Sequence, residues 1–148
     1  MKGFYLKWLT VFIGILILAA SCRKDDPVLP SEPTLVNPWE QVTGDIYGFF
    51  LLNEGNMGTN QASLDYYDYE TGVYTRNIYG ERNPYEVKDL GDVGNDIQIY
   101  GDKLWAVINC SNYVEVMDVN TAKHITKIAI PNCRYLAFKD KYAYVSAY

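Results

Sequence analysis

The sequence predicts an all-β fold built from repeated units of four short antiparallel strands. Three observations support this prediction. From Tyr47 onward the chain is rich in Tyr, Val and Ile and is punctuated by Gly and Asn, a composition typical of β-sheet. The segment 64–72 returns as 114–122, fifty residues later, and the segment 101–108 returns as 139–146, thirty-eight residues later. Such self-similarity indicates a repeated structural unit.

The two repeats together define the strands of one unit. Each copy of the first repeat reads as a strand, a turn opened by Asp-x-x-Thr and a second strand. The carboxylates of Asp68 and Asp118 can accept hydrogen bonds from the backbone of these turns. In the best-defined copy we expect strands near 96–100, 103–109, 113–119 and 124–130. An earlier unit would supply strands near 46–53, 63–69 and 73–79, and a later unit begins near Arg134.

Repeats of about 40 residues with four strands each are typical of β-propeller blades. One blade cannot bury both faces of its sheet, so neighbouring blades must stack against it. An antiparallel sandwich is the alternative, but it gives no reason for the same turn chemistry to recur. The sequence stops at Tyr148, inside the second strand of a third unit. We therefore expect residues 43–148 to form a partial β-propeller, the N-terminal two and a half blades of a longer ring.

The first 21 residues predict a bacterial lipoprotein signal peptide. Lys2 and Lys7 form a positive n-region, an apolar run covers 8–20, and small residues precede Cys22. A short transmembrane anchor is the alternative, but this run is shorter than the roughly 20 apolar residues that span a bilayer. We therefore expect cleavage before Cys22 and lipidation of that residue, which would attach the mature chain durably to a lipid membrane.

Residues 22–42 would connect this lipid to the folded body. Four of the six prolines lie within 23–38, where no apolar periodicity is found, as is typical of an extended spacer. The residues 23–26, Arg-Lys-Asp-Asp, resemble the surface-export signal of Bacteroidetes lipoproteins. We therefore expect a protein that is anchored in the outer membrane and exposed on the cell surface.

The charge balance argues against nucleic acid as a partner. Two of the 13 basic residues, Lys2 and Lys7, leave with the signal, whereas all 18 acidic residues remain. An acidic surface repels phosphate backbones and gains nothing from counterion release.

Several segments resemble a known family. The segment 49–58 (Phe-Phe-Leu-Leu-Asn-Glu-Gly-Asn-Met-Gly) with 64–68 resembles the opening blade of Bacteroidetes surface lipoproteins of the YncE-like, seven-bladed propeller family. The segments 94–97, 102–105 and 114–118 resemble its second blade. Some members capture cobalamin and pass it to a TonB-dependent transporter. The resemblance thus implies a non-enzymatic surface protein that captures a small molecule, with a corrinoid as one candidate. A propeller hydrolase or lactonase and a structural surface-layer protein remain alternatives.

The candidate ligand-binding residues lie in loops that a propeller places on one face: 53–62, 110–112 and 131–133. Asn53 and Asn56 in the first copy would correspond to Asn109 and Asn112 in the second. Amides suit an amide-rich ligand, and aromatic rings suit a flat one. Asn is also a frequent turn residue, and Tyr is equally plausible as packing between blades. The candidates are Asn53, Glu54, Asn56, Asn109, Asn112, Arg134, Tyr135 and Tyr148.

Two cysteines remain once Cys22 is lipidated. Cys110 and Cys133 belong at the same rim of the predicted fold, and an exported chain meets an oxidising compartment. A disulfide between them is therefore slightly favoured over two free thiols. Two thiols alone lack the four ligands of a structural zinc site.

Catalytic chemistry finds little support. The sole histidine, His124, occupies a strand position that Tyr74 holds in the other copy, which indicates a structural role. Asp89, Asp92 and Asp96 lie close in sequence, but their spacing does not fit a calcium-binding loop. We therefore expect no catalytic residue, no metal and no cofactor.

Overall fold

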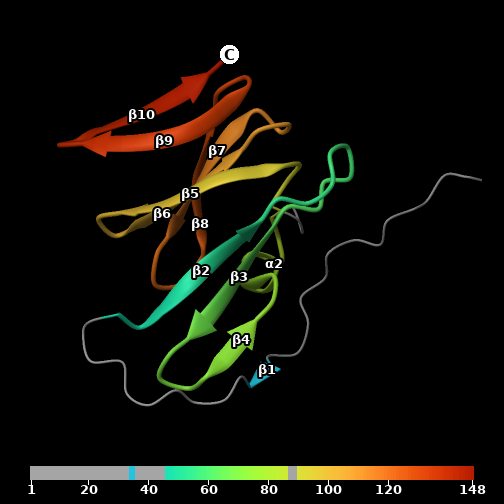
Figure 1. The fold of residues 1–148 in the computed structure, drawn as a ribbon, viewed down its shortest axis with the longest axis vertical. Helices are drawn as coiled ribbons and strands as arrows, with labels where there is room; N and C mark the ends of the chain where they lie inside the picture. The colour runs from blue at the N-terminus through green and yellow to red at the C-terminus, as the bar shows by residue number, and fades with distance from the viewer. Residues whose placement is uncertain (1–33, 36–45, 87–89) are drawn as a thin grey trace, which may run out of the picture.

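The computed structural model describes residues 34–35, 46–86 and 90–148 (Figure 1). The predicted signal peptide 1–21, Cys22 and most of the predicted tether 22–42 lie outside the described residues. Within the described part of the chain, no helix is both long enough and apolar enough to cross a membrane.

The described residues form three antiparallel sheets, which confirms the predicted all-β, propeller-like architecture. The first sheet has the strand order β1 (Thr34–Leu35), β4 (Val73–Thr75), β3 (Ser63–Asp68) and β2 (Gly48–Asn53). The second has the order β5 (Gly94–Tyr100), β6 (Lys103–Ile108), β7 (Tyr113–Asp118) and β8 (His124–Ala129). The third pairs β9 (Cys133–Lys139) with β10 (Tyr142–Ala147).

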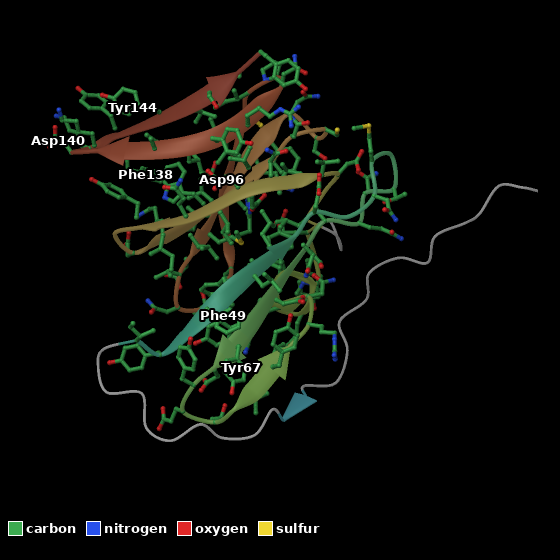
Figure 2. All side chains as sticks on the ribbon, in the orientation of Figure 1. Phe49, Tyr67, Asp96, Phe138, Asp140 and Tyr144 are labelled. Carbon is green, nitrogen blue, oxygen red and sulfur yellow. The ribbon has the colours of Figure 1, made fainter. Side chains whose placement is uncertain are left out.

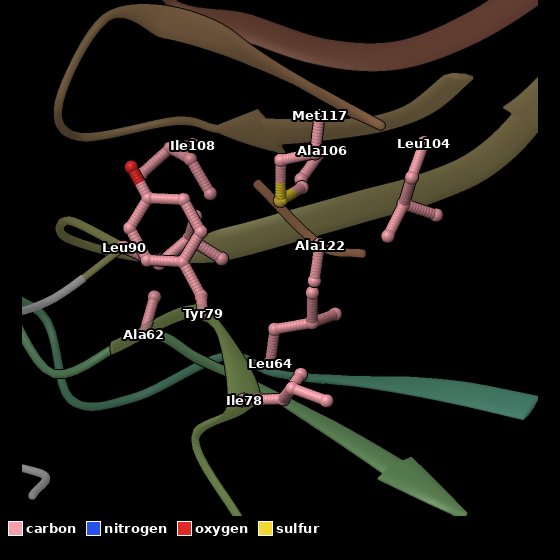
Figure 3. Close-up of a cluster of buried hydrophobic side chains, with 10 residues drawn as sticks. All are labelled: Ala62, Leu64, Ile78, Tyr79, Leu90, Leu104, Ala106, Ile108, Met117 and Ala122. Atoms are coloured by element: carbon pink, nitrogen blue, oxygen red, sulfur yellow. The ribbon is translucent and has the colours of Figure 1, made fainter. Parts of the chain in front are cut away.

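The second sheet lies between the other two and buries side chains on both of its faces (Figure 1). Alternate residues of a strand point to opposite faces. Leu104, Ala106 and Ile108 of β6 therefore pack toward the first sheet, in the cluster that Figure 3 shows. Val107 joins a smaller cluster on the other face, with Val114, Cys133 and Leu136. This stacking explains why the four-stranded unit recurs in the sequence.

The fifty-residue repeat coincides with equivalent strands, because β3 begins at Ser63 and β7 at Tyr113. The turn chemistry follows the prediction. Asp68 Oδ1 accepts hydrogen bonds from the backbone N–H groups of Glu70 and Thr71, each at 2.9 Å. Asp118 Oδ1 accepts the equivalent bonds at 3.1 and 2.9 Å.

The strand predicted over 73–79 is wrong beyond Thr75, because the short helix α2 covers Ile78–Arg82. Asn77 starts it with a left-handed backbone, φ 47°, and caps the N–H of Gly80 with its side-chain oxygen. The buried carboxylate of Asp65 accepts the N–H of Asn77 at 2.8 Å. The helix buries Ile78 and Tyr79 against the second sheet, which a continued strand would not do.

The thirty-eight-residue repeat is one residue shorter than the structural repeat. Lys103 opens β6 opposite Tyr100, and Tyr142 opens β10 opposite Lys139, an offset of 39. A one-residue slip exchanges the two faces of a strand. Val145 of β10 is therefore equivalent to Ala106, and it packs toward the preceding sheet as Ala106 does.

Candidate functional site

The three sheets meet along one rim, where β2 and β10 end and β5 and β9 begin (Figure 1). Backbone hydrogen bonds connect its parts: the N–H of Gly94 donates to the carbonyl of Glu54 at 3.0 Å, and the N–H of Asn109 donates to the carbonyl of Val93 at 2.8 Å. The Nδ2 of Asn109 donates to the carbonyl of Cys133 at 2.8 Å. Loops from all three sheets are thus held together at this rim, as the sequence predicts.

A β-bulge occurs at equivalent positions of β5 and β9. In the ladder between β5 and β6, Gly94 and Asp96 have consecutive partners, so Asn95 is the extra residue. In the ladder between β9 and β10, Cys133 and Tyr135 likewise leave Arg134 as the extra residue. A bulge frees a residue from the ladder and redirects its side chain. The two redirected residues meet across the sheets.

Arg134 is held by two neutral neighbours. Its Nη1 donates to Asn95 Oδ1 at 3.3 Å, while Asn95 Nδ2 donates to the carbonyl of Arg134 at the same distance. Its Nη2 donates to the hydroxyl of Tyr148 at 2.6 Å, and its Cζ lies 4.7 Å from the centre of the Tyr148 ring. Within the described residues, no carboxylate forms an ion pair with Arg134.

Three of the four candidate asparagines have structural hydrogen bonds. Asn53 Nδ2 donates to Ser63 Oγ at 3.1 Å, Asn109 is buried and donates to Cys133, and Asn112 Oδ1 accepts the N–H of Asn132 at 2.9 Å. The proposed correspondence of Asn53 with Asn109 is also one residue out of register. Leu52 lies opposite Leu64 as Val107 lies opposite Val114, so Asn53 is equivalent to Ile108.

Apart from the half-buried Arg134, the remaining candidates are exposed at or next to the rim. Glu54 and Asn56 lie in the exposed loop after β2. The residues Tyr135 and Tyr148 are 61% and 74% exposed. Together with Arg134 they provide a charge, aromatic surface and free polar groups in a backbone frame fixed by hydrogen bonds.

A family model matches residues 47–148, and its description is a domain of unknown function, DUF5074. The chain belongs to the DUF5074 family. The matched region begins just before β2, so the DUF5074 domain contains everything from β2 to Tyr148, including the whole rim. A search of curated proteins found no match.

The disulfide that the sequence predicts between Cys110 and Cys133 of the DUF5074 domain is absent, and both residues are free thiols. Cys133 points into the apolar cluster between the second and third sheets, where burial raises the pKa of its thiol. Its Sγ lies 3.4 Å from the carbonyl of Tyr113, whereas Cys110 lies on the turn with its Sγ 3.6 Å from Asn109 Oδ1. The two cysteines share a rim but point in different directions.

The aspartates near the start of β5 have separate structural roles in the DUF5074 domain. Both carboxylate oxygens of Asp92 accept the N–H of Gly58, at 3.0 and 2.8 Å. Asp96 Oδ2 accepts the N–H of Leu136 at 2.8 Å. Asp89 lies outside the described residues. In the ranges that the structure describes, no three His, Cys, Asp or Glu side chains are grouped so that they could hold a metal ion.

A buried polar cluster lies between α2 and the second sheet of the DUF5074 domain. Glu115 is fully buried, with Oε1 2.5 Å from His124 Nδ1 and Oε2 3.8 Å from Lys127 Nζ. Burial raises the pKa of Glu115, while His124 and Lys127 oppose that shift. Burial, and then the charge of Glu115, also raises the pKa of Tyr79. Sequence analysis missed this cluster, although a glutamate between Val114 and Val116 was a visible signal.

A cavity of about 700 Å³ lies at the opposite end of the sheets, between the two Asp-x-x-Thr turns. Its lining includes the aromatic side chains of Tyr47, Phe50 and Tyr66 together with Arg82. None of the predicted site residues lines it. Sequence analysis also missed Asn95, because only the bulge redirects its side chain toward Arg134.

Proposed function

We propose that this DUF5074 protein is a lipid-anchored, non-enzymatic binding protein on the surface of a bacterium, with the three-sheet rim as its ligand-binding face. Its ligand is a flat, amide-rich small molecule of the corrinoid type, which it hands to a TonB-dependent transporter. The lipid on Cys22 and the surface address at 23–26 belong to this proposal, as does relationship to the YncE-like propeller family.

The convergence of three sheets at one rim is the observation that supports the proposal best. Arg134 and Tyr148 are held in place before any ligand arrives, because Asn95 and the bulges fix them. A preorganised group loses little conformational freedom when it binds. Exposed rings such as that of Tyr135 offer flat surfaces for stacking at low entropic cost. These features fit capture of a rigid planar ligand.

Calorimetric titration of the mature chain with cyanocobalamin tests the proposal. We expect saturable binding that Tyr135→Ala weakens by about three- to tenfold, the range of one aromatic contact. Tyr144→Ala is the matched control, because Tyr144 is similarly exposed on the same two-stranded sheet, 54% against 61%, away from the rim. Absence of saturable binding, or equal loss in both variants, would contradict the proposed ligand face.

A further inference from the structure

We infer that Arg134 is the anchor for a singly charged oxyanion, a phosphodiester or carboxylate, on the ligand that this rim binds. The inference deepens the proposed function and rests on it for the location of the ligand. It adds the chemical group that the rim recognises and the residue that recognises it.

The first argument is that the charge of Arg134 is uncompensated. Its guanidinium donates only to the neutral oxygens of Asn95 and Tyr148, and a guanidinium has more donors than these two bonds use. Arg82 differs, because its Nε lies 3.6 Å from a carboxylate oxygen of Glu81. A half-buried cation without a counter-charge binds an oxyanion more strongly than a fully solvated one.

The second argument is that the structure fixes the guanidinium. The bulge at Arg134 removes this residue from the ladder, and the bulge at Asn95 provides its acceptor. The Tyr148 ring lies against the guanidinium and its hydroxyl accepts from Nη2. A planar guanidinium held in this way can use its remaining N–H groups to bind two oxygens of one anion. These constraints orient the charge in a way that a free surface side chain lacks.

The third argument concerns the charge of the anion. Glu54 lies exposed at the same rim, and the chain as a whole is acidic, with a formal charge of −5. One cation in such surroundings favours an anion with one negative charge over a dianion, because repulsion grows with the charge of the ligand. A phosphodiester or a carboxylate meets this condition, whereas a phosphate monoester does not.

Paired ligands that differ in the phosphodiester provide the test. The first pair is cyanocobalamin and dicyanocobinamide, which lacks the phosphodiester-linked nucleotide. The second is riboflavin 4′,5′-cyclic phosphate and riboflavin. We expect the mature chain to prefer the phosphodiester member of a pair. Arg134→Gln should reduce the affinity for that member about tenfold and leave the affinity for the member without the phosphodiester unchanged. Tyr148→Phe, which removes only the hydroxyl acceptor, should give a smaller loss in the same direction.

Arg82→Gln is the matched control, because it removes an exposed arginine remote from the rim. Equal losses in Arg134→Gln and Arg82→Gln, or no phosphodiester preference in either pair, would overturn the inference. Binding of the flavin pair with an Arg134-dependent preference, but no binding of either corrinoid, would support the oxyanion anchor and contradict the corrinoid proposal. Equal binding of both corrinoids would support the corrinoid proposal and contradict the oxyanion anchor. Circular dichroism of each variant establishes that the fold is retained.

Discussion

The two interfaces of the second sheet are built differently. Toward the first sheet, a large apolar cluster includes Leu64, Tyr79, Leu104 and Met117, all of them buried (Figure 3). Toward the third sheet, the buried cluster has four members among the described residues, and polar side chains of β5 bond to the backbone of β9. Asp96 accepts the N–H of Leu136, and Gln98 Nε2 donates to its carbonyl at 2.6 Å.

Aromatic side chains also join the second sheet to the third. Tyr100 of β5 stacks on Phe138 of β9 with ring centres 4.5 Å apart and planes 6° apart, and its hydroxyl donates to the carbonyl of Asp140. Figure 2 shows Asp96 and Phe138 between β5 and β9, whereas Phe49 and Tyr67 lie on the first sheet. The hydrogen bonds from Asp96 and Gln98 engage both backbone groups of Leu136, and they fix the alignment of β9 against β5. The second interface thus places Arg134 beside Asn95.

The largest effect on stability is expected from a substitution that disrupts the apolar interface. Leu104→Ala should lower the free energy of unfolding by about 2–5 kcal/mol, because it leaves a cavity among fully buried side chains. Urea denaturation measures the change. Leu51→Ala is the control, since Leu51 is 44% exposed and should cost much less. Equal costs for the two variants would show that the first interface does not dominate stability.

A smaller effect is expected from the polar interface. Asp96→Ala leaves the N–H of Leu136 without its acceptor and should cost about 1–3 kcal/mol in unfolding free energy. Asp96→Asn keeps an acceptor oxygen and should cost less. Because β9 also positions Arg134, Asp96→Ala should weaken binding of the phosphodiester ligands as well. Loss of stability with unchanged ligand affinity would show that the alignment of β9 does not determine the position of Arg134 at the rim.

The smallest effect concerns the buried carboxylate of the first interface. Burial raises the pKa of Glu115 above its ordinary value of 4.5. The folded chain therefore binds this proton more readily than the unfolded chain, so the contribution of Glu115 to stability is greatest below pH 4.5 and is lost as the pH rises through the raised pKa. Glu115→Gln should remove that loss, so its stability relative to wild type should increase with pH.

Thermal unfolding of both proteins across this pH range measures the difference. Glu54→Gln is the matched control, because it makes the same substitution at an exposed glutamate outside the buried cluster. A difference between Glu115→Gln and wild type that stays constant with pH would mean that His124 and Lys127 fully compensate the burial of Glu115.

The local chemistry of the turns explains why so much of the fold was predictable. Asp68 and Asp118 bond to backbone groups two and three residues ahead, so their effect is visible within a few residues of sequence. In the strands that follow, residues facing the core alternate with residues facing away from it, and this pattern is visible among neighbouring residues. Helix α2 was missed because a buried carboxylate, Asp65, twelve residues earlier, helps to define its start.

The sequence by itself determined the all-β class, the repeated antiparallel unit, the turn positions and the loops that gather at one rim. Each depends on residue type and on contacts close in the chain. The tertiary structure alone decided the 39-residue offset of the third sheet, the free state of Cys110 and Cys133, and the meeting of Asn95 with Arg134. These depend on strand register and side-chain direction, which a one-residue slip or a bulge reverses and which residues close in the chain do not reveal.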